Sequence, residues 1–235
     1  MNYSSPTLIM LRKIGQKLHI LKPLVNMTRL LLNSKYEEKF DEYTVSSIPA
    51  GSVVWDVGAN VGFFTDRFSN AVGDKGSVVA FDPSPNCISV LNEKFSENKN
   101  VIIEAFGLAD IAGQTDFSLE GGTDPTGGIG AREGHDVSVT VNISTGNSYI
   151  LEYPKRIPNF IKIDVEGYEY EALMGMTNVL SSKECRGVFI EVHFLQLTKR
   201  NMSDAPTKIV QLLKSYGFVV TWIDPSHLAA ERVTG

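Results

Sequence analysis

Cysteine is scarce in this chain, and long hydrophobic runs are absent. The 235 residues include two cysteines, Cys87 and Cys185, which are far apart and lack the short spacing of a metal-binding pair. We therefore expect two thiols in a reducing compartment, the cytoplasm, rather than a disulfide framework. No apolar run reaches the roughly 20 residues that cross a bilayer, so we expect no membrane-spanning helix. A hydrophobic content of 43% suits one globular domain with a sizeable core.

Acidic side chains are absent from the first 36 residues, whereas the rest of the chain is acidic. The remaining residues hold 27 acidic and 16 basic side chains, a net charge of −11. Because nucleic acids require a basic track, we expect no nucleic-acid partner. The basic side chains of the first segment are Arg12, Lys13, Lys17, Lys22, Arg29 and Lys35.

Residues 1–48 are expected to form a helical cap beside a main domain of residues 49–235. Apolar and cationic side chains mix in residues 8–21 as in an amphipathic helix, and Pro23 ends or kinks that helix. Lysine and histidine interrupt the apolar core that a secretory signal would need. Covering the domain is the favoured role of this cap. Contact with a membrane surface or a carrier is the alternative, and an oligomer is compatible with either.

Downstream of the cap, short apolar runs alternate with amphipathic segments. This alternation predicts an α/β fold with a mostly parallel sheet and helices on both faces. The glycine-rich residues 121–130 are expected to form a loop, either a lid on the acceptor pocket or a plain connection. Strands are expected at 53–57, 77–81, 101–105, 115–119, 137–143, 160–164, 187–192 and 218–223, and helices at 63–72, 85–98, 168–180 and 205–216.

The most informative segment is an apolar run that ends in an acid and continues into a glycine-spaced turn. Asp56 stands two residues before Gly58. A pyrophosphate at the following helix would be repelled by this carboxylate, whereas the ammonium and sulfonium of S-adenosylmethionine would tolerate it. Gly58 and Gly62 allow the backbone to approach a ligand closely. Asp82, 20 residues after Gly62, can accept hydrogen bonds from ribose hydroxyls, so an adenosine ligand is favoured over a bare turn.

Four expected strands end in ionisable side chains. Because the carboxyl ends of parallel strands share one edge of a sheet, we expect these side chains to converge there on a ligand site. Acids at strand ends also cap helices, but four at one edge favour a site. The four strands end at Asp56, at Asp82, at Asp164, and at Glu191 with His193.

Two carboxylates, Asp164 and Glu166, lie within three residues after one of these strands. They could act as a base, an orienting group or metal ligands, and either could cap the helix that begins near Tyr168. His193 shares a strand face with Glu191 and is a candidate general base. The remaining histidines are His19, His135 and His227, and they lack comparable partners in the sequence.

Together these residues resemble the FkbM family of S-adenosylmethionine-dependent methyltransferases. The motifs that carry the resemblance are Asp56–Gly62 with Thr65, Phe81–Pro85, Gly107–Gly113, Lys162–Gly167 and Ile190–His193. The resemblance implies a Rossmann-like class I methyltransferase fold with a seven-stranded sheet. It also implies methylation of a hydroxyl oxygen on a sugar or a polyketide-like natural product.

The resemblance further implies a role for each matching position. The methionine end of the donor would lie at Asp56, Gly58 and Asn60, the ribose at Asp82, the adenine at Leu108 and Ala109, and the methyl group or acceptor at Asp164 and Glu166. Further donor contacts are expected at Ala59, Gly62, Phe63, Thr65, Pro83, Ser84 and Asp164. The chain departs from the family in two places. Asp82 stands where many members have glutamate, and residues 141–147 replace a Leu-Asp-Asp stretch on the acceptor side.

An alcohol acceptor has a high pKa, so a base or a metal must assist the transfer. His193 or Asp164 is the expected base, with Glu191 orienting it. A divalent cation held by all three side chains is the alternative. Two other functions stay open, namely donor binding without catalysis, as a subunit or sensor, and NAD(P)-dependent oxidoreduction. The second is disfavoured, because Gly-x-Gly-x-x-Gly is missing and Asp56 is unfavourable there.

Overall fold

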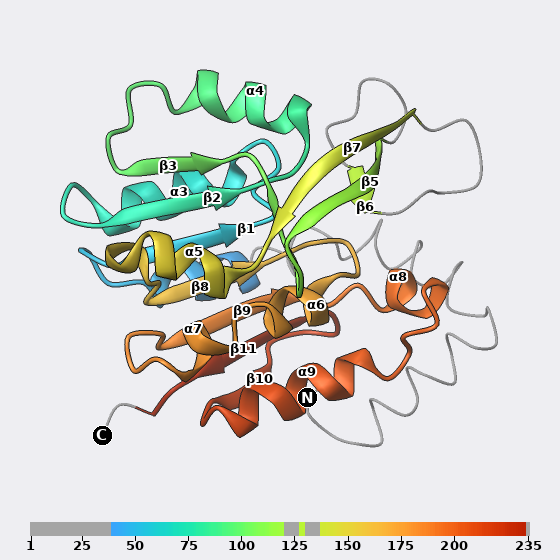
Figure 1. Ribbon diagram of the computed structural model, residues 1–235. Coiled ribbons are helices and arrows are strands. Elements are labelled where there is room, and N and C mark those ends of the chain that lie inside the picture. The colour runs from blue at the N-terminus through green and yellow to red at the C-terminus, as the bar shows by residue number, and fades with distance from the viewer. Residues whose placement is uncertain (1–38, 120–126, 130–136, 234–235) are drawn as a thin grey trace.

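The computed structural model describes residues 39–119, 127–129 and 137–233. Helices expected in residues 8–33, and most of the glycine-rich segment 121–130, lie outside the described residues. The central element is a seven-stranded sheet in the order β10-β11-β9-β8-β1-β2-β3 (Figure 1). Its strands are β1 (Val53–Val57), β2 (Ser77–Phe81), β3 (Val101–Glu104), β8 (Phe160–Ile163), β9 (Gly187–Glu191), β10 (Val219–Trp222) and β11 (His227–Glu231).

Six strands of this sheet run parallel, and β11 runs antiparallel to both of its neighbours. The strands β1, β2, β8 and β9 are buried on both faces, which explains why they read as short apolar runs without alternation. Register places Val54 beside Val78 and Phe160, so that these side chains share one face of the sheet. The expected mostly parallel seven-stranded sheet is confirmed.

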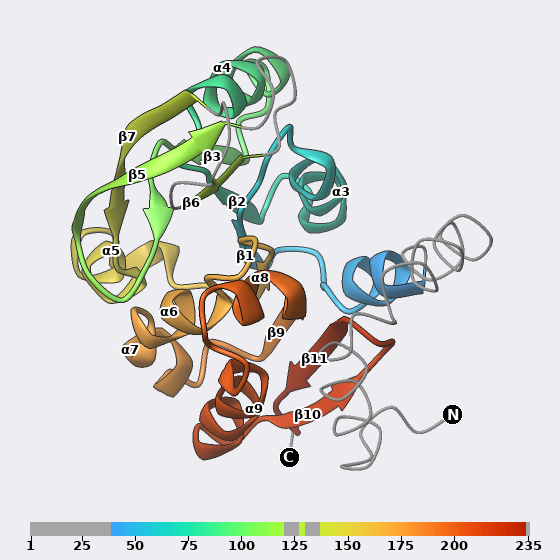
Figure 2. The same cartoon turned by 90° about the vertical axis from the view of Figure 1, so that its right-hand side faces the viewer.

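Helices cover both faces (Figure 2). On one face lie α3 (Phe63–Val72), α4 (Pro85–Lys94) and a helix of residues 39–46. Phe40 and Phe68 bury their rings there against Val54 and Phe189. On the other face lie α5 (Gly146–Glu152), α6 (Glu169–Met174), α7 (Thr177–Ser181) and α9 (Ala205–Ser215). The largest of the three hydrophobic clusters among the described residues, which includes Trp55, lies under these helices.

A second, four-stranded sheet lies beyond the carboxyl ends of β1–β3 (Figure 1). Its strand order is β4-β7-β5-β6. The chain enters it directly after β3 and leaves it into α5. It is made of β4 (Gly107–Leu108), β5 (Gly113–Leu119), β6 (Gly127–Ile129) and β7 (Val137–Ser144). The small strand β6 is a correction, because the glycine-rich segment was expected to hold no strand, yet three of its residues pair with β5.

Other differences from the expected elements have tertiary causes. The helix expected at 168–180 is split at Gly175, whose carbonyl accepts a hydrogen bond from the backbone N–H of Asn147. The helix expected at 85–98 ends at Lys94. Two short helices, α5 and α8 (Phe194–Lys199), and the strand β11 were not expected.

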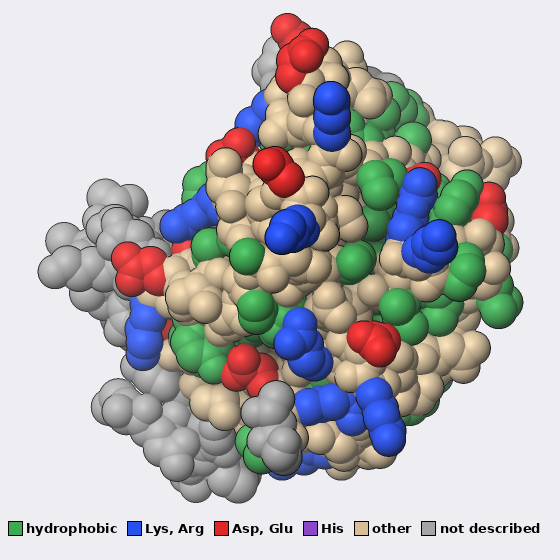
Figure 3. Space-filling model, turned by 90° about the vertical axis from the view of Figure 1, so that its left-hand side faces the viewer, with side chains coloured by type: hydrophobic (Ala, Val, Ile, Leu, Met, Phe, Trp, Pro, Cys, Tyr) green, Lys and Arg blue, Asp and Glu red, His purple; other side chains and the backbone are tan. Residues whose placement is uncertain are grey.

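Among the described residues, no helix is long and apolar enough to cross a membrane. The face at the amino ends of the parallel strands carries acidic and basic side chains interspersed with one another (Figure 3). No strongly charged patch of one sign gathers in this view. The ionisable side chains that the sequence singled out follow the opposite ends of the strands.

Replacing Gly175 with alanine is expected to destabilise the fold by about 1–3 kcal/mol. A Cβ at this position would lie 1.8 Å from the backbone carbonyl oxygen of Ala109, so the chain would have to move. Gly107→Ala is the matched control, because its Cβ would meet its neighbours at 3.5 Å or more. Urea unfolding of both variants checks the prediction, and equal stabilities would contradict it.

Candidate active site

The carboxyl ends of four neighbouring strands meet at one edge of the sheet, as the sequence predicts. Asp56 lies near the end of β1, and Asp82 follows β2. Asp164 follows β8, and Glu191 is the last residue of β9. The parallel register of β2, β1, β8 and β9 therefore brings these side chains to one edge.

The glycine turn after β1 is held in a narrow space. Gly58 has φ 81°, and a Cβ on it would lie 1.9 Å from the carbonyl oxygen of Asp164. Gly62 has φ 76°, and a Cβ there would lie 2.5 Å from the ring of Phe95. Only glycine fits at both positions, because of the left-handed backbone and the close neighbours. The turn thus passes directly over the start of the loop after β8.

Asp82 joins the loops after β1 and β2. Its carboxylate accepts hydrogen bonds from the backbone N–H groups of Asn60, at 2.8 Å, and Ser84, at 2.9 Å. Burial raises the pKa of Asp82 to about 6, although both hydrogen bonds oppose the rise. The Ser84 side chain in turn accepts from the backbone N–H of Cys87 and caps α4. Asp82 therefore stabilises the backbone of the turn that would cradle a nucleoside.

The expected adenine side lies close to Asp82. Gly107 packs beside Pro83, and a Cβ on this glycine would be 3.5 Å from the proline side chain. Leu108 and Ala109 are buried, and the backbone N–H of Ala109 donates to the carbonyl of Ser144 at 2.8 Å. The loops after β2 and β3 thus meet where the resemblance places the adenine.

Asp56 is fully buried and faces the protein interior. One carboxylate oxygen accepts a hydrogen bond from the hydroxyl of Thr65 at 2.6 Å, and the other lies 3.9 Å from the Lys162 ammonium. Burial raises the pKa of Asp56 despite these partners. In this structure Asp56 positions Thr65 and Lys162 and is shielded from solvent. By contrast Phe63, another expected donor contact, is 55% exposed at the start of α3.

Lys162 is a buried cation that the sequence reasoning missed. Its ammonium donates to Asp164 at 3.1 Å and lies over the ring of Phe64. Burial lowers its pKa, but Asp164 and Asp56 outweigh burial and raise it, so the side chain is charged. The sequence did contain a signal for this buried cation, namely a lysine inside the apolar strand Phe160–Ile163.

The four expected catalytic side chains lie together, with three carboxylates around the imidazole of His193. His193 Nε2 lies 3.6 Å from Asp164 Oδ1, 3.5 Å from Glu166 Oε1 and 3.8 Å from Glu191 Oε1. Its Nδ1 lies 2.7 Å from Glu169 Oε1. Burial lowers the pKa of His193, but the Glu169 hydrogen bond and the neighbouring carboxylates outweigh it and raise the pKa to about 10.

Glu169 was also missed from the sequence. The side chain is fully buried in the first turn of α6, and one oxygen accepts from both His193 and the backbone N–H of Gly167. The second oxygen has no hydrogen-bond partner among the described residues. An acid shortly after the Asp164-Val165-Glu166-Gly167 motif was a visible signal, but nothing in the sequence indicated that it faces His193.

His227, for which the sequence offered no comparable partner, has two carboxylate partners in the structure. Its Nδ1 lies 2.7 Å from Asp224, its Nε2 lies 3.4 Å from Glu191 Oε2, and its ring stacks on Phe40. Pairing of β11 with β9 places His227 directly opposite Glu191. Burial lowers the pKa of His227, but Asp224 and Glu191 raise it to about 9. Burial raises the pKa of Glu191, but His227 and His193 outweigh it and lower the pKa to about 2.

Glu166 turns into the site through a left-handed backbone. It has φ 51°, a conformation that costs a non-glycine residue about 1–3 kcal/mol and occurs often at functional sites. Gln196 holds one of its oxygens through a hydrogen bond of 2.8 Å. A Cβ on the next residue, Gly167, would lie 2.7 Å from the Gln196 side chain.

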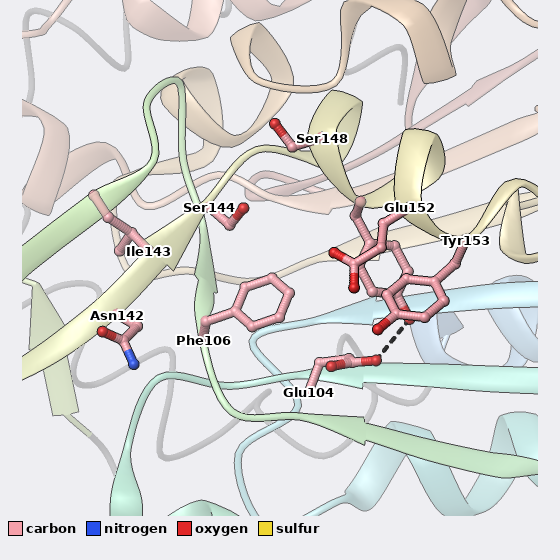
Figure 4. Close-up of a pocket in the computed structure, with 9 residues that line it drawn as sticks. Glu104, Phe106, Asn142, Ile143, Ser144, Ser148, Glu152 and Tyr153 are labelled. Carbon is pink, nitrogen blue, oxygen red and sulfur yellow. Dashed lines mark hydrogen bonds between the residues drawn. The ribbon is translucent and has the colours of Figure 1, made fainter.

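A pocket of about 280 Å³ lies between α5, the end of β7 and the edge strand β3 (Figure 4). Its acidic and aromatic lining includes Glu104, whose carboxylate accepts hydrogen bonds from Tyr149 and Arg156. None of the expected site residues lines this pocket. It is therefore distinct from the cluster at the carboxyl edge.

Replacing Lys162 with methionine is expected to destabilise the fold by about 3–5 kcal/mol, because Asp56 and Asp164 would lose the buried cation that lies between them. The double variant Asp56→Asn/Lys162→Met removes both charges and should recover part of this loss. Denaturant unfolding of the wild type and of the single and double variants measures the coupling. A single variant within about 0.5 kcal/mol of the wild type would contradict a role for this ion pair.

Relatives of the chain are methyltransferases. The family model of the Methyltransferase FkbM domain matches residues 56–220. Hexuronic acid methyltransferase AglP of Haloferax volcanii is 34% identical over 148 residues, which make up 60% of this chain and 56% of that protein. The chain thus spans little more than half the length of this relative.

Two solved structures share the fold. SMU.1697c of Streptococcus mutans, in complex with SAH, has a TM-score of 0.53 at 14% identity and covers 85% of this chain and 98% of that chain. The precorrin-6y C5,15-methyltransferase of Geobacter metallireducens has a TM-score of 0.51 at 14% identity, over 82% and 87% of the two chains. The expected class I methyltransferase fold is confirmed.

The matched family region contains the glycine turn, the acid after β2, and the carboxylates and histidine gathered at the carboxyl edge. The chain belongs to the FkbM family of methyltransferases.

Proposed function

We propose that this protein transfers a methyl group from S-adenosylmethionine to a hydroxyl oxygen of a sugar. The observation that carries the proposal is a cluster beside the glycine turn. In it, the carboxylates of Asp164, Glu166 and Glu191 surround His193 at the carboxyl edge of the sheet. Donor cradle and acceptor-activating groups are then adjacent, as an in-line transfer requires. The SAH bound to the Streptococcus mutans protein of the same fold supports the choice of donor.

The name of the Haloferax relative supports the choice of acceptor. That protein is a hexuronic acid methyltransferase, so a sugar acceptor is favoured here over a polyketide-like alcohol. Both cysteines are buried thiols, which suits the reducing cytoplasm expected from the sequence.

We assign the donor to the loops after β1, β2 and β3. The methionine end would lie along the turn of Gly58, Asn60 and Gly62, the ribose at Asp82, and the adenine between Pro83 and Leu108. Asp82 offers carboxylate oxygens at the end of β2. Asp56 does not contact the donor in this assignment and instead holds Thr65 and Lys162 in place beneath the turn. Asp164 would be the carboxylate nearest the methyl group.

In the transfer, the acceptor oxygen attacks the methyl carbon, the carbon–sulfur bond breaks, and its electron pair stays on sulfur as SAH forms. The acceptor proton must pass to a protein group. His193 is a poor acceptor of that proton at neutral pH, because its neighbours hold it protonated. Asp164 is therefore the better candidate for the base, with Glu191 and His193 orienting it.

The test is calorimetric titration with S-adenosylmethionine, SAH and NAD(H), followed by methyl transfer to uronic acids and neutral sugars. We expect micromolar binding of the first two ligands, no binding of NAD(H), and transfer to a sugar hydroxyl. Binding of NAD(H) alone would overturn the proposal. Donor binding without transfer to any sugar or alcohol would favour the non-catalytic alternative.

Donor affinity is expected to fall at low pH. Only ionised Asp82 can accept hydrogen bonds from both ribose hydroxyls, and its pKa is raised to about 6 in the free protein. Acidification through this pKa should therefore weaken SAH binding about tenfold between pH 7 and pH 5. Asp82→Asn should bind weakly with a flat profile. Matching pH profiles for the two proteins would show that Asp82 is not the titrating group.

Asp164→Asn is expected to lower kcat by about 10²–10⁴-fold, since it removes the base while keeping the shape of the side chain. SAH affinity should change less than about threefold, because donor binding rests mainly on the loops after β1 to β3. Asp74→Asn, in an exposed turn before β2, is the control. Radiolabelled methyl transfer measures the effect, and normal turnover of Asp164→Asn would rule out this role.

A further inference from the structure

We infer that Asp164, Glu191 and His193 form a divalent cation site that binds the acceptor hydroxyl. One ligand atom from each residue lies within 4.8 Å of the others. This inference rests on the proposed function, because it explains how a sugar hydroxyl is activated. The three ligands come from the ends of β8 and β9 and from the residue before α8, so the sheet itself brings them together.

Each ligand has one atom anchored outside the site and another turned into it. Asp164 Oδ2 accepts from Lys162, and its Oδ1 faces His193. Glu191 Oε2 lies 3.4 Å from His227, and its Oε1 faces His193. Such outer partners fix the direction of metal ligands and raise their affinity.

The imidazole of His193 is likewise held by an outer partner at one nitrogen and faces the site with the other. His193 Nδ1 contacts the fully buried Glu169 at 2.7 Å, which leaves Nε2 directed at the carboxylates. A carboxylate–histidine pair with the second nitrogen facing outward is the usual setting of a metal-bound histidine. Glu169 has no other side-chain hydrogen-bond partner among the described residues, and its second oxygen has none at all. A fully buried acid in such a position is costly unless it serves the imidazole.

Glu166 lies beside the three ligands and faces the same imidazole. Gln196 holds its Oε2, and its Oε1 lies 3.5 Å from His193 Nε2. Oxygen and nitrogen ligands around a small divalent cation lie about 3 Å from one another, since each is about 2.1 Å from the ion. The distances of 3.6 and 3.8 Å from His193 Nε2 to Asp164 and Glu191 therefore close onto an ion with shifts of less than about 1 Å.

The charge of the cluster also favours a cation. Six carboxylates lie at or next to this site, and among the described residues three cationic side chains contact them, with both imidazoles protonated. A divalent ion would displace the Nε2 proton of His193, so its net effect would be one added positive charge, and the ion would provide a contact for an acceptor that is itself anionic, such as a uronic acid. The carboxylates are Asp56, Asp164, Glu166, Glu169, Glu191 and Asp224, and the cations are Lys162, His193 and His227.

A bound cation changes the assignment of the base. Asp164 would then serve as a ligand, and the cation would lower the pKa of the acceptor hydroxyl. Glu166 would take the hydroxyl proton, while the oxygen attacks the methyl carbon and the carbon–sulfur bond breaks with its electron pair left on sulfur. Oxygen ligands with a single imidazole suit Mn²⁺ and Mg²⁺, and Mn²⁺ serves as the probe.

The test is Mn²⁺ binding to the chelator-treated, full-length protein, followed by the electron paramagnetic resonance of free Mn²⁺. We expect one ion per chain with micromolar affinity, and at least a tenfold loss in Asp164→Asn and Glu191→Gln. His227→Gln, which leaves every ligand in place, should lose about tenfold through the orientation of Glu191. Asp74→Asn should bind as the wild type does.

SAH titration of the same samples separates the two proposals. Wild-type protein that binds SAH but no Mn²⁺ up to millimolar concentration would overturn the cation site and leave the proposed function standing. Equal Mn²⁺ affinity in Asp164→Asn and Asp74→Asn would also overturn it. Mn²⁺ binding that depends on these ligands, in a protein that binds no SAH, would support the cation site and count against the proposed donor.

Discussion

The buried ion pair of Lys162 with Asp56 and Asp164 is the interaction on which the carboxyl edge depends. It links the two central strands, β1 and β8, at the level where the glycine turn passes over them. A cation at this depth lets two carboxylates lie close together in a region of low dielectric. It also leaves one oxygen of Asp164 directed outward, so the interior of the sheet sets the geometry of the surface site.

A second chain of contacts reaches the site from the helix of residues 39–46. Phe40 stacks on His227, which contacts Glu191, and Tyr43 of the same helix hydrogen-bonds to Glu231 of β11. The helix of residues 39–46 therefore supports the imidazole that orients a site carboxylate. The antiparallel strand β11 contributes to the same chain of contacts, because it brings His227 beside Glu191 of β9.

The strand order separates the groups suited to the donor from the groups suited to the acceptor. Loops after β1, β2 and β3 hold backbone N–H groups, glycines and one acid of raised pKa, a set suited to a nucleoside. Loops after β8 and β9 hold carboxylates and an imidazole, a set suited to a hydroxyl acceptor and a cation. The glycine turn touches both sets, since Gly58 packs against the carbonyl of Asp164. Donor and acceptor would thus meet across a single backbone contact.

The sequence alone determined the parallel sheet, the glycine turn and the edge at which Asp82, Asp164, Glu191 and His193 meet, because strand periodicity and the order of elements are local properties. Tertiary structure decided the rest. Lys162 lay hidden inside an apolar strand, and Glu169 and His227 contact the site only after α6 and β11 pack beside it. Their contacts depend on packing and register between distant segments, which no local pattern encodes. For the same reason the sequence singled out the carboxylates and the histidine at this edge but could not reveal the partners that orient them.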